Sequence, residues 1–368
     1  MKKILIAILT VLILTSSFAA CKPAATDAPQ ISPATVGSPS EPAQTSPATN
    51  ETPSEPASTD ETTEEEQPQS ILYRYATAEE GRELLMSNTA YYAGFTENDL
   101  QYRLKKADAA LADMDEYLAF AKEQVIDFTD EQKAKIDGKI GEIVGKLNDN
   151  GYILPPIDEI VFVNTTMKEE SGAGGYTHGT QIYLNAAQIC ALNETEQYSW
   201  ILEYMLVHEL FHCLTRCNPD FRAEMYKLIH FTVQEKDFEL PPSVLEYYIS
   251  NPDVEHHDAY ATFTIDGRPT DCFLAFVTKE HYEKEGDTFF TTATAALVPV
   301  DGSDVYYYPE DTSDFLEVLG GNTGYTVDPE ECMADNFAYL IVYGLTGPDG
   351  SGFASPEIIE GIVAYLQK

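Results

Sequence analysis

Basic residues are scarce in this chain. Its 368 residues include 22 lysines and arginines against 61 aspartates and glutamates, which gives a formal net charge of -39. Binding to nucleic acid through phosphate neutralisation needs clustered cations, so we exclude a nucleic-acid partner. Hydrophobic residues make up 43% of the chain, which is enough to bury a core, and the excess of acids is typical of a solvated surface.

The chain also lacks a long apolar run at its N-terminus. Residues 4–14 are apolar apart from one threonine, but a run this short does not span a bilayer as a stable anchor. With Lys2-Lys3 before it and small residues after it, the segment predicts a cleaved signal peptide over residues 1–20. Cys21 directly follows Phe18-Ala19-Ala20, which resembles the lipobox of bacterial lipoproteins. The resemblance implies a lipidated Cys21 and an extracytoplasmic protein anchored to a bacterial membrane; the alternative is a plain signal peptide with an incidental cysteine.

Between Lys22 and Gln69 there is no aromatic residue, and proline, serine, threonine, alanine and glutamate dominate. Such a segment cannot form a core, so residues 21–69 are expected to be a disordered tether. Folded sequence begins near residue 70. Residues 70–150 are expected to form a helical N-terminal region, with apolar residues on one face over 96–118 and again over 129–147.

After residue 151 the apolar pattern changes its period. Ile160–Val163 and Gln181–Leu184 are predicted strands, joined by the glycine-rich residues 171–179. A helix is predicted from 194 to 216, and because it is apolar nearly all round it is expected to be buried. Residues 151–368 are therefore expected to form one domain around this helix.

Three polar side chains interrupt the buried helix: His208, Glu209 and His212. Residues four apart lie on one helical face, so both imidazoles can reach one cation from the same side. A carboxylate next to the first ligand can take a proton from a water activated by the metal. The alternative is a pair of buried histidines satisfied by hydrogen bonds.

The third ligand decides the class of metal site. A longer motif with a third histidine would need a glycine three residues after His212 and a histidine six residues after it. This chain has Thr215 and Asn218 there, so that class is excluded. Downstream, an apolar helical run opens at Pro329 and places Glu331 and Asp335 four apart on one face. Acidic residues are also favoured in the first turn of any helix, so the alternative is that these acids only stabilise the start of the helix.

His208-Glu209-x-x-His212 followed by Glu331-x-x-Ala334-Asp335 resembles the gluzincin metallopeptidases, the broad group that includes thermolysin and the anthrax lethal factor type. The resemblance implies one zinc ion per chain, with Glu331 as third ligand and Asp335 orienting His208 through its other ring nitrogen. Glu330 is the competing choice for the third ligand.

The same resemblance implies an α+β, zincin-like fold. It would have a short mixed sheet with an edge strand, a buried active-site helix, and a C-terminal helical region that supplies the third ligand. Tyr325 is the candidate donor to the developing oxyanion. Gln181–Leu184 is expected to be the edge strand along which an extended peptide binds. His178, just before it, is interpreted as a loop residue.

Residues 232–325 are expected to be an insertion with strands over 259–265, 272–277 and 291–298, the first two joined by a turn at 266–269. The cluster Glu255-His256-His257-Asp258 is a candidate for a metal ligand or a polar donor, with an exposed loop as the alternative.

Once Cys21 is set aside, five cysteines remain, so at least one is unpaired. Cys213 and Cys217 are expected to be thiols that pack around the active helix, although soft metal ligation is the other interpretation.

The function expected from these residues is zinc-dependent endopeptidase activity at the cell surface. Glu209 would act as general base, and the partners would be a peptide or protein substrate and, through the N-terminal lipid, a membrane. Two alternatives remain open: a non-catalytic surface binding module on a zincin fold, and a zinc hydrolase of non-peptide or cell-wall amide bonds.

Overall fold

Five strands form a mixed sheet in the computed structural model, which describes residues 69–284 and 286–368. The strand order is β1-β3-β5-β4, with β2 antiparallel to the end of β3; β3 is parallel to β1 and β5, and β4 is antiparallel to β5. The bounds are β1 Tyr73–Tyr75, β2 Val125–Ile126, β3 Ile160–Thr165, β4 Gly175–His178 and β5 Gln181–Leu184. The predicted signal peptide, Cys21 and residues 22–68 of the predicted tether lie outside the described residues.

The edge of this sheet differs from the prediction. β5 lies between β3 and β4, so the expectation that Gln181–Leu184 forms the edge strand was wrong, and β4 is the edge instead. The cause lies in the glycine-rich stretch, which contains strand β4. A tight connection through Gly179, whose φ is 58°, joins β4 to β5 as a hairpin. His178 is accordingly the last residue of a strand, not a loop residue.

Thirteen α-helices occur in the described residues, and the mixed α+β class predicted from the sequence is confirmed. The first six α-helices in chain order are α2 Ala78–Ser87, α3 Thr89–Ala93, α4 Glu97–Leu104, α5 Met114–Gln124, α6 Asp130–Asp149 and α7 Ala186–Asn193. The later helices are α8 Ile201–Cys217, α9 Pro219–Lys227, α10 Pro242–Leu245, α11 Phe289–Thr292, α12 Phe315–Leu319, α13 Pro329–Tyr343 and α14 Pro356–Leu366.

One of the two helices predicted in the N-terminal region from apolar periodicity is in fact two helices. The apolar pattern over 96–118 predicts one helix, but α4 ends at Leu104 and is capped by Lys105, whose φ is 57°. α5 starts anew after Asp113, whose side chain accepts from the Glu116 N–H. The predicted helix after Thr129 is confirmed as α6, where Thr129 and Gln132 form a reciprocal cap.

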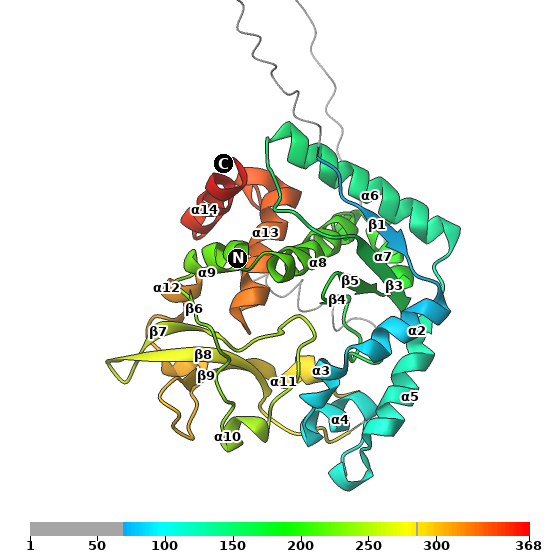
Figure 1. Ribbon diagram of the computed structural model, residues 1–368. Helices are drawn as coiled ribbons and strands as arrows, with labels where there is room; N and C mark the ends of the chain where they lie inside the picture. The colour runs from blue at the N-terminus through cyan, green and yellow to red at the C-terminus, as the bar shows by residue number, and fades with distance from the viewer. Residues whose placement is uncertain (1–68, 285) are drawn as a thin grey trace, which may run out of the picture. The chain divides into compact units, whose positions relative to one another are not determined.

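The two helices that carry the predicted site pack against each other. α8 begins at Ile201, later than the predicted start at 194, and nearly all of its residues from there to Thr215 are buried. Figure 1 shows α8 in green beside α13 in orange, and α8 also contacts β4 and α6. α13 is buried from Pro329 to Ile341, so the apolar run predicted to begin at Pro329 is confirmed as an interior helix.

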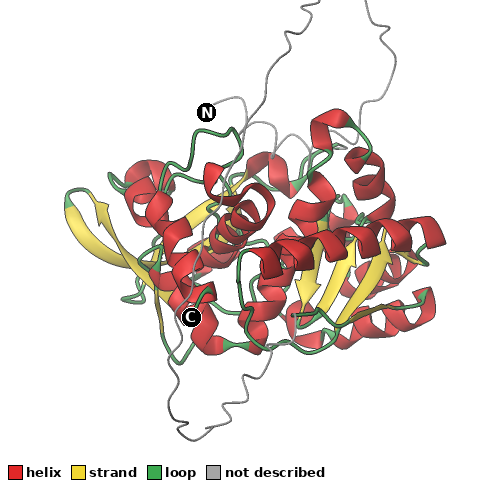
Figure 2. Ribbon diagram, turned by 90° about the horizontal axis from the view of Figure 1, so that it is seen from above, coloured by secondary structure: helices red, strands yellow, loops and turns green. Residues whose placement is uncertain are grey.

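The second sheet is antiparallel, with the order β6-β7-β8-β9. Its bounds are β6 Thr232–Val233, β7 Ala259–Ile265, β8 Arg268–Thr278 and β9 Ala293–Pro299. The predicted turn is tighter than expected, because only Asp266 and Gly267 have positive φ and Arg268 already pairs with Ile265. Figure 2 shows the two sheets as separate groups of strands with helices between them.

The first described residue, Gln69, is attached to the folded region. Although the sequence assigns Gln69 to the tether, its N–H donates to Asn148 at 3.1 Å, and its side chain accepts from the Leu154 N–H at 2.6 Å.

Among the described residues, no helix has the length and apolar character needed to cross a membrane.

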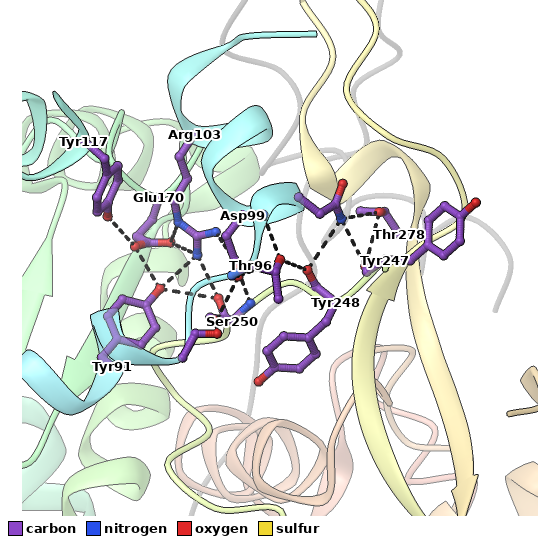
Figure 3. A network of polar contacts seen from close by, with 12 residues as sticks. Tyr91, Thr96, Asp99, Arg103, Tyr117, Glu170, Tyr247, Tyr248, Ser250 and Thr278 are labelled. Atoms are coloured by element: carbon purple, nitrogen blue, oxygen red, sulfur yellow. Dashed lines mark hydrogen bonds and ion pairs between the residues drawn. The ribbon is translucent and has the colours of Figure 1, made fainter. Parts of the chain in front are cut away.

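A buried ion-pair network joins α4 to two loops near the sheet (Figure 3). Arg103 contacts Asp99 and Glu170, each at 2.6 Å, and none of the three side chains is more than 3% exposed. The same guanidinium donates to the Ser250 carbonyl at 2.7 Å, and Asp99 accepts from the Ser250 N–H at 2.8 Å. The network therefore fixes the start of the loop that follows Ile249.

We predict that Arg103→Met lowers the free energy of unfolding by about 3–5 kcal/mol, because two carboxylates stay buried without their cation. Arg74 is the matched control: it also contacts two carboxylates, Glu80 and Glu159, but its side chain is 40% exposed. Arg74→Met should cost less than about 1 kcal/mol. Urea unfolding of both variants measures the difference, and equal costs would contradict this account.

Candidate metal centre

Three side chains from α8 and α13 converge. His208 and His212 lie on one face of α8, and Glu331 lies in the first turn of α13. Glu331 Oε2 is 3.1 Å from His208 Nε2 and 3.6 Å from His212 Nε2, and the three potential ligand atoms lie within 4.8 Å of one another. Two imidazole nitrogens and one carboxylate oxygen at these spacings could hold a metal ion.

Glu331 presents only one oxygen to the imidazoles. Its other oxygen, Oε1, accepts from Asn251 Nδ2 at 2.5 Å and from the Tyr325 hydroxyl at 3.0 Å. These two donors leave Oε2 as the oxygen available to a metal. Tyr325, expected to be the donor to an oxyanion, therefore lies at the site, but its hydroxyl is directed to the Glu331 carboxylate.

Each histidine has a carboxylate at its other ring nitrogen. Asp335 Oδ1 is 3.1 Å from His208 Nδ1, the neighbour that the sequence motif implied. Glu330 Oε1 is 2.9 Å from His212 Nδ1, so Glu330 lies on the far side of the imidazole from the ligand atoms. The His212 contact has hydrogen-bond geometry, whereas the His208 contact has only the short distance. Carboxylates at these positions can fix the orientation of an imidazole and leave its Nε2 for a metal.

These carboxylates are themselves held by hydroxyl groups. Asp335 accepts from Tyr204 and from Thr323, while Glu330 accepts from Thr215 at 2.6 Å and from Tyr226 at 2.5 Å. Hydrogen bonds of this kind support metal ligands in proteins. The role of Glu330 was missed, because the sequence offered it only as a rival to Glu331.

The donor set fits a cation. His212 Nε2 is fully buried and has no hydrogen-bond partner among the described residues, which is costly unless a further group binds there. Burial alone would lower the pKa of His208, but Asp335 and Glu331 outweigh it and raise that pKa well above its usual range. Burial would raise the pKa of Glu331, but His208 and His212 lower it to about 2.

Glu209 is held from the sheet side. Its Oε2 accepts from the Thr177 hydroxyl of β4 at 2.7 Å. A methyl group at Gly175 would lie 2.8 Å from Glu209 Oε1, so a larger residue at that position of β4 would have to displace the Glu209 carboxylate. Burial raises the pKa of Glu209, although His212 and His208 oppose the shift. A carboxylate of this kind is suited to general base chemistry nearer neutral pH.

A second buried carboxylate, Asp253, lies beside Glu209. Asp253 Oδ1 is 4.0 Å from His212 Nε2, and Glu209, His212 and Asp253 form another group of potential ligand atoms within 4.8 Å of one another. Burial raises the pKa of Asp253 well above its usual range, and Glu209 and Glu331 add to the shift. Asp253 and Asn251 were not predicted from the sequence; their nearest signal was the acidic and histidine-rich cluster that begins at Glu255.

That cluster supplies no ligand to the His208, His212 and Glu331 group. Glu255 pairs with Arg216 at 2.9 Å, and Asp258 pairs with Arg222 at 2.6 Å. His256 is exposed near Asp237, and His257 Nε2 lies 3.0 Å from the Tyr248 hydroxyl. The cluster is therefore mostly tied to neighbouring elements.

The other sequence candidates also lie outside the group. His178 is buried against the Tyr91 ring, with centroids 4.8 Å apart, and burial lowers its pKa to about 3. Cys213 is buried and Cys217 half-buried, and all five cysteines of the described region are free thiols.

A cavity of about 250 Å³ opens beside the centre. His208, Glu209, Asp253 and Glu331 form one part of its wall. The rest is largely apolar and aromatic, including Ile189, Leu192, Trp200, Ile201, Tyr204, Met205, Phe276, Phe289 and Tyr339. A polar group of this kind at the wall of an apolar cavity is typical of a site for a small molecule or a peptide side chain.

No family model, curated protein or solved structure matches this chain.

We predict that Glu330→Gln and Asp335→Asn each weaken the affinity for an added divalent metal ion by about 10–100-fold, since each removes the anion next to one imidazole. Glu331→Gln should weaken it more, because it removes one of the three potential ligands. Glu317 is exposed on α12 and serves as the control for loss of one charge. Chelator competition measures all four variants; a silent Glu330→Gln would show that His212 needs no carboxylate partner.

Proposed function

We propose that this chain is a zinc-dependent peptidase with a zincin-like fold. The observation that carries the proposal is the convergence of two imidazole nitrogens and one Glu331 oxygen beside a separately held carboxylate, Glu209. A structural zinc site would be closed by four protein ligands, whereas three ligands leave a position for a water or a substrate. The His208-Glu209-x-x-His212 spacing supports the same class of site.

In this proposal, His208, His212 and Glu331 hold the zinc, while Asp335 and Glu330 orient the two imidazoles. A bound zinc ion would supply Lewis-acid activation of water and of a substrate carbonyl. Glu209 would accept the proton from the attacking water and deliver it to the leaving amine. The Thr177 hydroxyl would hold Glu209 in place, and the Tyr325 hydroxyl would restrain Glu331.

The apolar cavity supports a peptide as substrate. Aromatic and aliphatic side chains around its wall would bind one bulky apolar side chain of the substrate next to the scissile bond. We further propose that the enzyme acts outside the cell, held to a membrane by lipid on Cys21, as its N-terminal sequence indicates.

The experiment compares purified zinc-loaded protein with Glu209→Gln on a library of short peptides. We predict that Glu209→Gln retains zinc but loses about 10²–10⁴-fold in kcat, because the proton acceptor is removed while the ligands remain. Zinc content by mass spectrometry and peptide cleavage by chromatography provide the two readouts. Equal cleavage by both proteins would exclude Glu209 as the base, and zinc binding without cleavage would favour a binding module.

Gly175 offers a second test of the position of Glu209. We predict that Gly175→Ala lowers kcat/KM by about 10–100-fold with little change in zinc affinity, since a misplacement near 1 Å is enough for such a loss. Gly138→Ala on α6 is the matched control, because nothing lies within 4 Å of a methyl group there. Unchanged cleavage by Gly175→Ala would mean that the carboxylate can move without consequence.

A further inference from the structure

The outer edge of β4 is already occupied by the chain itself. The Thr177 N–H points away from β5 and donates to Asp253 Oδ1 at 2.7 Å. Two residues on, the Gly179 N–H donates to Glu255 Oε1 at 3.2 Å. Residues 250–255, here called the edge segment, thus use the donors that an extended peptide would need to continue along this strand.

The edge segment is firmly attached at both ends. Its first residue, Ser250, is bonded to the buried Arg103 and Asp99 of α4 (Figure 3). Near its other end, Arg216 of α8 donates to the Pro252 carbonyl at 3.1 Å and pairs with Glu255 at 2.9 Å. Its residues 250–253 are buried. Displacement of this segment would break a buried ion network, so it is a fixed wall of the site.

The wall carries a buried carboxyl group, Asp253, with no lysine or arginine in contact with it among the described residues. Asp253 is 9% exposed at its side chain, and among the described residues no lysine or arginine lies within 4.0 Å of it; the nearest basic atom is His212 Nε2, at 4.0 Å. Its Oδ1 is bonded to Thr177, whereas no described group donates to its Oδ2. A positively charged ligand next to Asp253 would offset the cost of burying an ionised carboxylate there.

We propose that Asp253 binds the α-ammonium group of the substrate, which makes this enzyme an aminopeptidase that removes residues from free N-termini. This inference rests on the proposed peptidase function and narrows its substrate class. The apolar cavity lies on the Gly174 and Gly175 side of β4, and the edge segment closes the strand at Thr177 and Gly179. A substrate bound between them has room for its N-terminus but not for further residues on that side.

A metal ion is the other cation that Asp253 could bind, but the distances between the potential ligand atoms favour the ammonium group. The ligand atoms of His208 and His212 lie 3.1 and 3.6 Å from Glu331 Oε2, whereas Asp253 Oδ1 is 4.0 Å from His212 Nε2. Asp253 belongs to a group of potential ligand atoms with Glu209 and His212, which shares only His212 with the group that contains Glu331. Its carboxylate therefore lies beside the centre, on the side of the attacking base.

The experiment uses the full zinc-loaded chain and two matched pairs of probes. The first pair is a tripeptide amide, Leu-Phe-Ala, with a free or an acetylated N-terminus, and the readout is kcat/KM. The second pair is leucine hydroxamate and its N-acetyl form, whose binding is measured by calorimetry without any turnover. We expect the free amine to be favoured by about 10–100-fold in both pairs, as for a hydrogen bond between charged groups.

Asp253→Asn keeps an acceptor for the Thr177 N–H but removes the charge. In this variant, the ratios of free to acetylated probe, in kcat/KM and in binding affinity, should fall to within about threefold of unity, because the ion pair with the ammonium is lost. Zinc affinity should stay the same. Glu317→Gln is the control for charge loss at a distance and should leave both preferences intact. A drop in zinc affinity with an intact preference for the free amine would instead assign Asp253 to the metal and overturn the inference.

The remaining outcomes separate this inference from the proposed function. Glu209-dependent cleavage that is equal on free and acetylated peptides, or at internal bonds of an unfolded protein, overturns the aminopeptidase assignment and leaves a peptidase. Absence of zinc binding and of Glu209-dependent cleavage removes the proposed function. If neither hydroxamate binds, the inference fails as well.

Discussion

The repulsion among buried carboxylates between α8, α13 and the edge segment is the constraint on which the centre depends. Five acids are buried there: Glu209, Asp253, Glu330, Glu331 and Asp335. In a region of low dielectric, such a group persists only with positive charge among its members. His208 and His212 occupy the middle of the group, and each contacts one carboxylate at each ring nitrogen or close to it. The centre is therefore a place where cation binding relieves an electrostatic cost already present in the fold.

The helices can supply this geometry because both are interior. A surface helix would let its acids turn to water, but α13 is buried from its first residue, Pro329, so Glu330 and Glu331 have to point into the protein. Consecutive residues on a helix diverge by about 100°, and the two glutamates accordingly reach opposite sides of the His212 ring. Hydroxyl groups from Tyr226, Thr215 and Tyr325 satisfy the remaining oxygens, which keeps each carboxylate in one orientation.

The parts of this arrangement that local sequence governs were predictable. The His208 and His212 spacing, the cap at Thr129 and the turn at Asp266 are each set within a few residues, and the structure has them where the pattern indicates. Contacts between distant segments were not predictable: Asn251 is 80 residues from Glu331, and Thr177 is 76 residues from Asp253. Apolar spacing failed at Lys105 because apolar residues continue at helical intervals through a break in the backbone. The prediction of a loop before Gln181 failed because Gly175 lies within β4, where it accommodates Glu209 and does not end the strand.

The insertion that carries the second sheet also contributes to the site. Its edge segment supplies Asn251 to the outer oxygen of Glu331 and Asp253 to the outer edge of β4, so a single loop restrains a potential ligand from one helix and covers a strand. The Asp253 N–H donates to Asn251 Oδ1 at 3.0 Å, which couples the two contacts. Because α4 holds the loop through Arg103 and α8 holds it through Arg216, any shift of the loop has to disturb elements on both sides of the centre. The positions of the three potential ligand atoms and the extent of the open edge of β4 are thus set by the same few residues, and neither can change independently of the other.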